Sequence, residues 1–176
     1  EKTNIQNVSQ RGCILAHNRV ILDAIKNNFT NILILEDDVY LDDNFFEKIE
    51  EILDNVPRWD ILYFGASQKK WDGIKIDNNK IYYDAHNTLG TFAYALNKSL
   101  FRSITDYSME LIDPIDKCLQ IFHHFNSCLV LYPNIIISNL ENSKIHRSRD
   151  IDIYSKIYKW DLDNFDLELY DYIENE

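Results

Sequence analysis

The sequence predicts an α/β fold, in which helices flank a sheet. Two observations support this class: short apolar runs typical of buried strands, and intervening segments with hydrophobic residues at helical spacing. Strands that alternate with helices along a chain predict a layered α/β architecture. The chain has 176 residues with only 4 glycines and 3 prolines. This length predicts a single domain over residues 1–176, with residues 150–176 as a C-terminal tail.

The first part of the chain predicts two helices on either side of one strand. Residues 11–28 form an amphipathic pattern, and the run NILIL at 31–35 predicts a buried, parallel strand. Residues 42–56 begin with two aspartates, which favour a helix N-terminus. The expected buried positions are Ile14, Leu15, Asn18, Ile21, Leu22 and Ile25 in the first helix, and Phe46, Ile49, Ile52 and Leu53 in the second.

The second part continues the alternation. Residues 59–65 (WDILYFG) and 91–97 (TFAYALN) predict further strands. Between them, residues 68–84 predict a hairpin with Asn78 and Asn79 at its turn. The remaining predicted elements are a helix at 98–107, a helix at 113–125 with Pro114 in its first turn, and a strand over 127–138 interrupted at Pro133.

Charge and composition exclude some functions. The net charge is -11 with a pI of about 4.8, which argues against a protein that binds nucleic acid phosphates or an anionic membrane surface. A negatively charged substrate would need a bound divalent cation as neutraliser. The chain has three cysteines, and no two of them have CxxC spacing. This pattern predicts buried free thiols. No apolar run is long enough to span a bilayer, and the localisation is open between the cytoplasm and the secretory lumen.

The triplet Glu36-Asp37-Asp38 directly follows the NILIL run. Ligands bind at the carboxyl ends of strands in α/β sheets, so chemistry is expected here. Strand side chains alternate, so Glu36 and Asp38 would share one side with Asp37 opposite. Like charges this close favour a bridging cation, and oxygen ligands suit Mg²⁺, Mn²⁺ or Ca²⁺ rather than Zn²⁺.

Several motifs resemble a known family. They are RGCILAH at 11–17, ILEDDV at 34–39, WDILYFG at 59–65, GTFAYALNKS at 90–99, PID at 114–116 and YPNIIISN at 132–139. In this order they resemble the glycosyltransferases of family 25, which include lipooligosaccharide and collagen galactosyltransferases. Ala16 stands where that family usually has serine.

The resemblance implies a GT-A fold, a Rossmann-related mixed sheet flanked by helices. Because the chain starts close to the Gly-Cys helix, the first strand of the family is expected to be absent. The resemblance further implies inverting transfer of a hexose, galactose or glucose, from a nucleotide sugar, usually a UDP-sugar. The acceptor would be a glycan or a hydroxylated protein, and Mn²⁺ or Mg²⁺ the cofactor.

The resemblance suggests roles for eight residues. Asp38 and Glu36 would bind the metal, and Glu36 and Asp37 would also contact the donor. His17 would lie near the donor. Asp116 would serve as general base or bind the acceptor, since inversion needs a carboxylate to take the acceptor proton. In the C-terminal part, His146 would complete the metal site, and Arg147 would bind the diphosphate together with Arg149.

Two alternatives stay open. The first is a non-catalytic carbohydrate-binding or interaction module with a degenerate transferase fold, suggested by the short N-terminus and Ala16. The second is a Mg²⁺-dependent phosphotransfer or prenyl-diphosphate enzyme, because DDVYLDD at 37–43 resembles an aspartate-rich diphosphate motif. That motif belongs on a helix in all-α proteins, so an α/β context argues against it.

Overall fold

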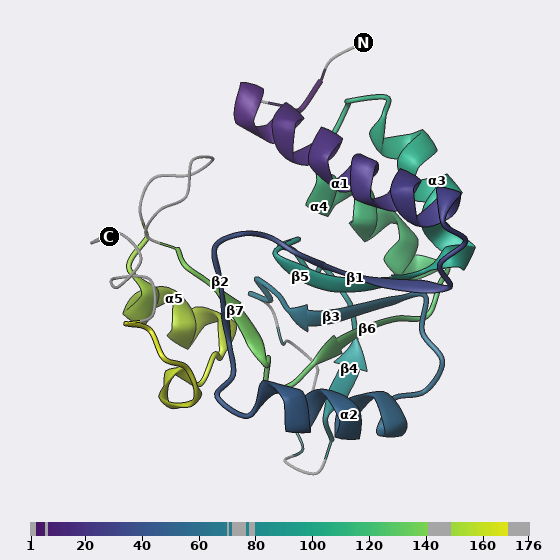
Figure 1. The fold of residues 1–176 in the computed structure, drawn as a ribbon. Coiled ribbons are helices and arrows are strands. Elements are labelled where there is room, and N and C mark those ends of the chain that lie inside the picture. Colours follow the sequence, from purple (N-terminus) through teal and green to yellow (C-terminus); the bar gives the residue numbers. More distant parts are fainter. Residues whose placement is uncertain are drawn as a thin grey trace.

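The computed structural model describes residues 3–5, 7–69, 71, 77, 80–140 and 149–168 (Figure 1). Its main sheet has five strands in the order β1-β5-β3-β6-β4. They are β1 (Asn31–Leu35), β3 (Ile61–Gly65), β4 (Tyr82–Asp84), β5 (Ala93–Asn97) and β6 (Cys128–Leu131). Of these described strands, β3 and β6 pair in parallel and the other neighbours are antiparallel. The predicted mixed α/β sheet is confirmed.

Helices cover both faces of this sheet. Helices α1 (Val8–Lys26), α3 (Lys98–Ser108) and α4 (Ile115–Gln120) lie on one face, and α2 (Phe45–Asn55) lies on the other (Figure 1). The central strand β3 shows why both faces need cover, because all of its residues are buried. Ile61 and Tyr63 pack into the cluster on the α1 side, and Leu62 and Phe64 into the cluster on the α2 side, as strand alternation requires.

Helix α1 confirms the first predicted helix, but its buried face is rotated from the prediction. Asn7 caps it, because its side chain accepts a hydrogen bond from the Gln10 N–H at 2.9 Å. Leu15 and Leu22, which we expected inside, are 42% and 46% exposed. Ile14 and Ile21 are buried as expected. So are two polar residues: Asn18, which we expected inside, and His17, which we did not. Both find hydrogen-bond partners in the interior.

Strand β1 departs from the prediction of a buried parallel strand. It lies at the edge of the main sheet and pairs antiparallel with β5. Within β1, Ile34 is buried, whereas Leu33 and Leu35 on the opposite face are 38% and 42% exposed. The prediction failed because the following strands do not add on in chain order: β5 enters the sheet between β1 and β3 and runs against both.

The segment before helix α2 confirms a helix-starting role for Asp42. Its buried carboxylate accepts a hydrogen bond from the Asn44 N–H at 2.9 Å and pairs with Lys48. Asp43 is exposed. The predicted apolar face of this helix is only partly right. Ile52 is buried, but Phe46 and Leu53 are 79% and 47% exposed, and Phe45 is buried instead.

Three further predictions concern the second half of the chain. The helix at 113–125 is confirmed as α4 followed by the 3-10 turn η1 (Ile121–His124), with Pro114 just before the first helical residue. The strand over 127–138 is split at Pro133 into β6 and β7 (Ile136–Ser138). The predicted turn at Asn78 and Asn79 lies outside the described residues; β4, near it, pairs with β6.

The C-terminal segment forms the end of the molecule where the site lies. Strand β2 (Val39–Leu41) pairs with β7, next to α5 (Ile151–Tyr158) and the short turn η2 (Leu162–Asn164) (Figure 1). Three aromatic rings of this segment, from Tyr158, Trp160 and Phe165, are buried in the α2-side cluster. The sequence predicted no helix here. None of the described helices is both long and apolar enough to cross a membrane.

Trp160→Phe is expected to lower the free energy of unfolding by about 1–3 kcal/mol. The Trp160 indole N–H donates to Asn134 Oδ1 at 2.9 Å and to the Ala66 carbonyl at 3.2 Å. Phenylalanine removes this buried donor from both acceptors. Urea denaturation measures the change. Trp59→Phe is the matched control, because Trp59 packs half-buried at the edge of the same cluster. An equal loss in both variants would contradict the role of the buried hydrogen bonds.

Candidate functional site

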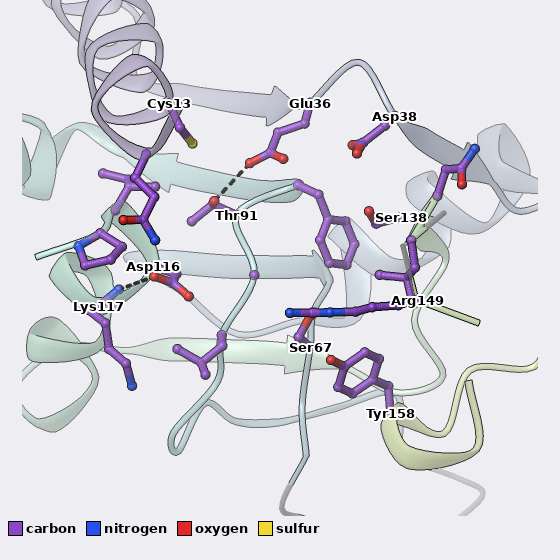
Figure 2. A pocket seen from close by; sticks show the side chains of 18 of the residues that line it. Cys13, Glu36, Asp38, Ser67, Thr91, Asp116, Lys117, Ser138, Arg149 and Tyr158 are labelled. Carbon is purple, nitrogen blue, oxygen red and sulfur yellow. Dashed lines mark hydrogen bonds between the residues drawn. The ribbon is translucent and has the colours of Figure 1, made fainter. Parts of the chain in front are cut away.

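A cavity of about 350 Å³ lies beyond the carboxyl end of β1 (Figure 2). Its walls come from α1, the turn after β1, the segment before β5, the start of α4, the end of β7 and the C-terminal segment. The side chains discussed below that line it are Cys13, Glu36, Asp38, Ser67, Lys69, Thr91, Asp116, Arg149 and Tyr158. Segments far apart in the sequence therefore meet at one site, and several of them bring charged groups.

Glu36 is held at the edge of the cavity by two side chains. Its Oε1 accepts a hydrogen bond from the Thr91 hydroxyl at 3.0 Å and lies 3.3 Å from His17 Nε2. The His17 Nδ1 lies 2.8 Å from the hydroxyl of Tyr94. Tyr94 is fully buried, which holds its pKa well above the usual range. The hydroxyl therefore stays protonated, and the chain Tyr94–His17–Glu36 orients the carboxylate.

The surroundings of Asp38 disfavour the charged form of its carboxylate. Burial, and then the charges of Glu36 and Asp37, raise its pKa from 3.8 to about 6. Its Oδ1 is buried and has no hydrogen-bond partner among the described residues. A buried carboxylate oxygen without a donor is unfavourable on its own. The position fits a divalent cation, which would supply the missing partner and offset the repulsion from the neighbouring acids.

The raised pKa of Asp38 predicts a pH dependence of stability without metal. The folded protein binds the Asp38 proton more tightly than the unfolded chain, so the contribution of this group becomes destabilising as pH rises from about 4 to 6. Across this window, the unfolding free energy of Asp38→Asn should therefore rise relative to that of the wild type by about 1 kcal/mol. The effect is no larger because solvent screens the charge of a half-buried group. Denaturation in EDTA at several pH values measures this. A constant difference would contradict it.

Asp116 faces the cavity from another wall (Figure 2). It lies in the first turn of α4, and its Oδ1 accepts a hydrogen bond from the Lys117 N–H at 2.8 Å. The negative charge of Asp116 acts on the thiol of Cys13, which lines the same cavity. Burial first, and then Glu36, Asp116 and Asp38, raise the pKa of the Cys13 thiol to about 12. Three carboxylates thus line the cavity, together with the cationic side chains of Lys69, Lys117 and Arg149.

Arg149 supplies positive charge on the side of the C-terminal segment (Figure 2). Its guanidinium lies 5.3 Å from the ring centre of Tyr154, a cation–π distance. Tyr158 lies beside it on the cavity wall; burial raises the pKa of this tyrosine, while Ser67 and Arg149 act in the opposite direction. An arginine that lies near several carboxylates suits an anionic ligand that binds together with a cation.

The structure brings together part of the predicted site. Glu36, Asp38 and Asp116 line the cavity, and His17 is buried behind Glu36. Asp37 is exposed and does not line the cavity, as the alternation of side chains predicted. His146 and Arg147, the other two predicted residues, lie outside the described residues, in the segment 141–148.

Sequence reasoning missed several residues of this site. Thr91 and Tyr94 lie within GTFAYALN, a motif we interpreted only as a strand, although its position in the order of motifs marked it. Cys13 was expected to be buried; it is a free, half-buried thiol on the cavity wall, whereas Cys118 and Cys128 are buried and free as predicted. Nothing in the local sequence around Tyr158 indicated that it reaches the site.

The mixed α/β sheet and the charged cavity beside it define the general class, a protein with a ligand site at strand ends. Comparison with known families is more specific. The family model described as "Glycosyltransferase family 25 (LPS biosynthesis protein)" matches residues 4–119, well over half of the chain. The chain belongs to glycosyltransferase family 25. The matched region includes Glu36, Asp38 and Asp116 and ends before Arg149.

Curated relatives are similar over part of the chain. A "Glycosyltransferase 25 family member" of Aedes aegypti is 24% identical over 115 residues, which is 62% of this chain and 19% of the relative. A "Probable inactive glycosyltransferase 25 family member 3" of Rattus norvegicus is 23% identical over 116 residues, 62% of this chain and 20% of the relative. The "Inactive glycosyltransferase 25 family member 3" of Homo sapiens is 30% identical over 61 residues, 32% of this chain and 10% of the relative. The chain thus spans about a fifth or less of these relatives.

Proposed function

We propose that this chain is a metal-dependent inverting glycosyltransferase with a GT-A fold. It would move a hexose, galactose or glucose, from a UDP-sugar to a glycan or to a hydroxylated protein. Family membership supports the transferase class. The observation that carries the proposal is the meeting of Glu36, Asp38 and Asp116 at one cavity, where a buried oxygen of Asp38 has no partner among the described residues.

Glu36 and Asp38 would hold the cation, Mn²⁺ or Mg²⁺, with carboxylate oxygens. When bound, it would act as a Lewis acid that stabilises the charge developing on the leaving nucleoside diphosphate. The Tyr94–His17–Glu36 chain supports this assignment, because groups that orient a ligating carboxylate tune the metal site. Arg149, which lines the same cavity, would bind the diphosphate through paired hydrogen bonds.

Asp116 is our candidate for the general base. In an inverting transfer, a carboxylate takes the proton of the acceptor hydroxyl as that hydroxyl attacks the sugar. Asp116 reaches the cavity from α4, a different wall from that of Glu36 and Asp38 (Figure 2). This separation supports a division of roles, in which the β1 end binds the donor and the α4 start faces the acceptor.

The test is transfer and donor binding with a panel of nucleotide sugars, each with Mn²⁺, with Mg²⁺ and with EDTA. Donor hydrolysis without an acceptor is measured in the same assays, because it detects activity while the acceptor is unidentified. We expect turnover or donor binding that depends on the metal for at least one UDP-hexose. Absence of both turnover and metal-dependent donor binding, in a protein that is folded by circular dichroism, would reject the proposal.

A second candidate function is a non-catalytic carbohydrate-binding module. The relatives named inactive in rat and human support it. Saccharide binding that persists in EDTA and in Asp38→Ala, without turnover, would favour this candidate. The prenyl-diphosphate alternative is not supported, because its aspartate-rich segment forms a turn and strand β2 in a mixed α/β fold rather than part of a helix.

A further inference from the structure

Cys13, His17 and Glu36 form a cluster that shares Glu36 with the acidic pair of the proposed donor site but adds a thiol and an imidazole to it. One ligand atom from each residue lies within 4.8 Å of the other two. Cys13 and His17 are four residues apart on α1, so their side chains lie on the same face of the helix. Glu36 approaches from the end of β1. We propose that these residues form a second metal site, selective for a thiophilic divalent cation of the zinc class.

The spacing of the ligand atoms suits a tetrahedral ion. Zinc bonds of about 2.0–2.3 Å to nitrogen, oxygen and sulfur place tetrahedral ligand atoms about 3.3–3.6 Å apart. His17 Nε2 and Glu36 Oε1 are already 3.3 Å apart. The Cys13 sulfur lies within 4.8 Å of one ligand atom of each of these residues, so it has to approach by no more than about 1.5 Å. A change of this size is within reach of a side-chain rotation, because Cys13 is half-buried and lies at the cavity wall.

The surroundings of His17 match those of a ligating histidine. Such a histidine usually donates its second ring N–H to a nearby acceptor, which fixes the tautomer. In this structure His17 Nδ1 lies 2.8 Å from the Tyr94 hydroxyl, which leaves Nε2 directed at Glu36. The Thr91 hydroxyl holds the same Glu36 oxygen. Both imidazole and carboxylate are therefore oriented before a cation arrives.

Ligand chemistry determines which cation this site favours. A thiolate and an imidazole suit Zn²⁺, Co²⁺ or Cd²⁺, whereas Mn²⁺ and Mg²⁺ prefer oxygen ligands. Cys13 binds as the thiolate, so its proton leaves to solvent on binding. The thiolate and Glu36 then balance the two charges of the ion. Because Cys13 and Glu36 line the cavity, the fourth position of the ion would face it and be open to water or an exogenous ligand.

Cobalt titration of the metal-free chain tests this site independently of any transferase activity. Tetrahedral Co²⁺ bound to a thiolate gives a thiolate-to-metal charge-transfer band in the near ultraviolet and strong visible bands. We expect one equivalent of Co²⁺ to produce both, and Zn²⁺ to displace it. The charge-transfer band should be lost in Cys13→Ser and retained in Cys128→Ser, a control whose cysteine is buried in β6 away from the cavity.

Two further variants separate ligation from folding. His17→Gln should weaken Zn²⁺ binding more than Tyr94→Phe, which removes only the supporting hydroxyl and should weaken it by about 10–100-fold. Circular dichroism establishes that each variant is folded. Absence of the band in the wild-type chain, or its full retention in Cys13→Ser, would overturn the proposal. Mn²⁺-dependent transfer without a cobalt band would overturn this site alone, and a cobalt band without any turnover or metal-dependent donor binding would support it while rejecting the proposed function.

Discussion

Asp116→Asn is expected to lower kcat for sugar transfer by about 10²- to 10⁴-fold while leaving donor affinity unchanged. Asparagine keeps the shape of the side chain and can still accept a hydrogen bond from the Lys117 N–H. It cannot take the proton of the acceptor hydroxyl. The carboxylates at the donor end of the cavity, Glu36 and Asp38, are untouched. The measurements are steady-state transfer kinetics and donor titration in the presence of Mn²⁺.

The matched control for this variant is Asp106→Asn, the same chemical change at an exposed position on α3. It should retain the kcat of the wild type. If Asp116→Asn instead raised the KM for the acceptor and left kcat intact, Asp116 would bind the acceptor rather than act as the base. If donor affinity fell together with kcat, the division of the cavity into a donor wall and an acceptor wall would be wrong.

The sequence predicted the fold class because the spacing of apolar residues is a local property. It did not predict the place of β1 in the sheet. The run NILIL has the same pattern whether its strand is central or at an edge, and strand pairing depends on segments far away in the chain. The same limit explains the rotated face of α1, where the unexpected burial of His17 goes with a partner, Tyr94, that comes from β5.

The candidate site also contains residues that the sequence could predict and residues that it could not. Glu36 and Asp38 could be predicted because they follow an apolar strand and alternate along the backbone. Thr91 and Tyr94 could not, since they reach the site through the antiparallel pairing of β5 with β1, which sets Tyr94 opposite Ile34. Tyr158 reaches it because Trp160 anchors the C-terminal segment to Asn134 and Ala66. Only chemistry carried by neighbouring residues was visible in the sequence.

Asp38→Asn is expected to decrease metal-dependent donor binding and turnover by about 10²- to 10³-fold while leaving the fold as stable as the wild type or more stable. The wild-type carboxylate is half-buried beside Glu36 and Asp37, and its buried Oδ1 lacks a partner among the described residues. Neutralising it relieves repulsion in the metal-free protein. The same change removes a charged oxygen ligand from the proposed Mn²⁺ site, so binding and stability should move in opposite directions.

This opposition distinguishes a metal ligand from a structural acid. An acid that stabilises the fold through hydrogen bonds, such as the buried Asp42 with its contacts to Asn44 and Lys48, should lose stability when neutralised. The control for activity is Asp43→Asn, because Asp43 is exposed and does not line the cavity. Thermal unfolding in EDTA and calorimetric titration of donor with Mn²⁺ give the two measurements. Two results would contradict this role of Asp38. One is a lower melting temperature for Asp38→Asn than for the wild type, and the other is Mn²⁺-dependent donor binding equal to that of the wild type.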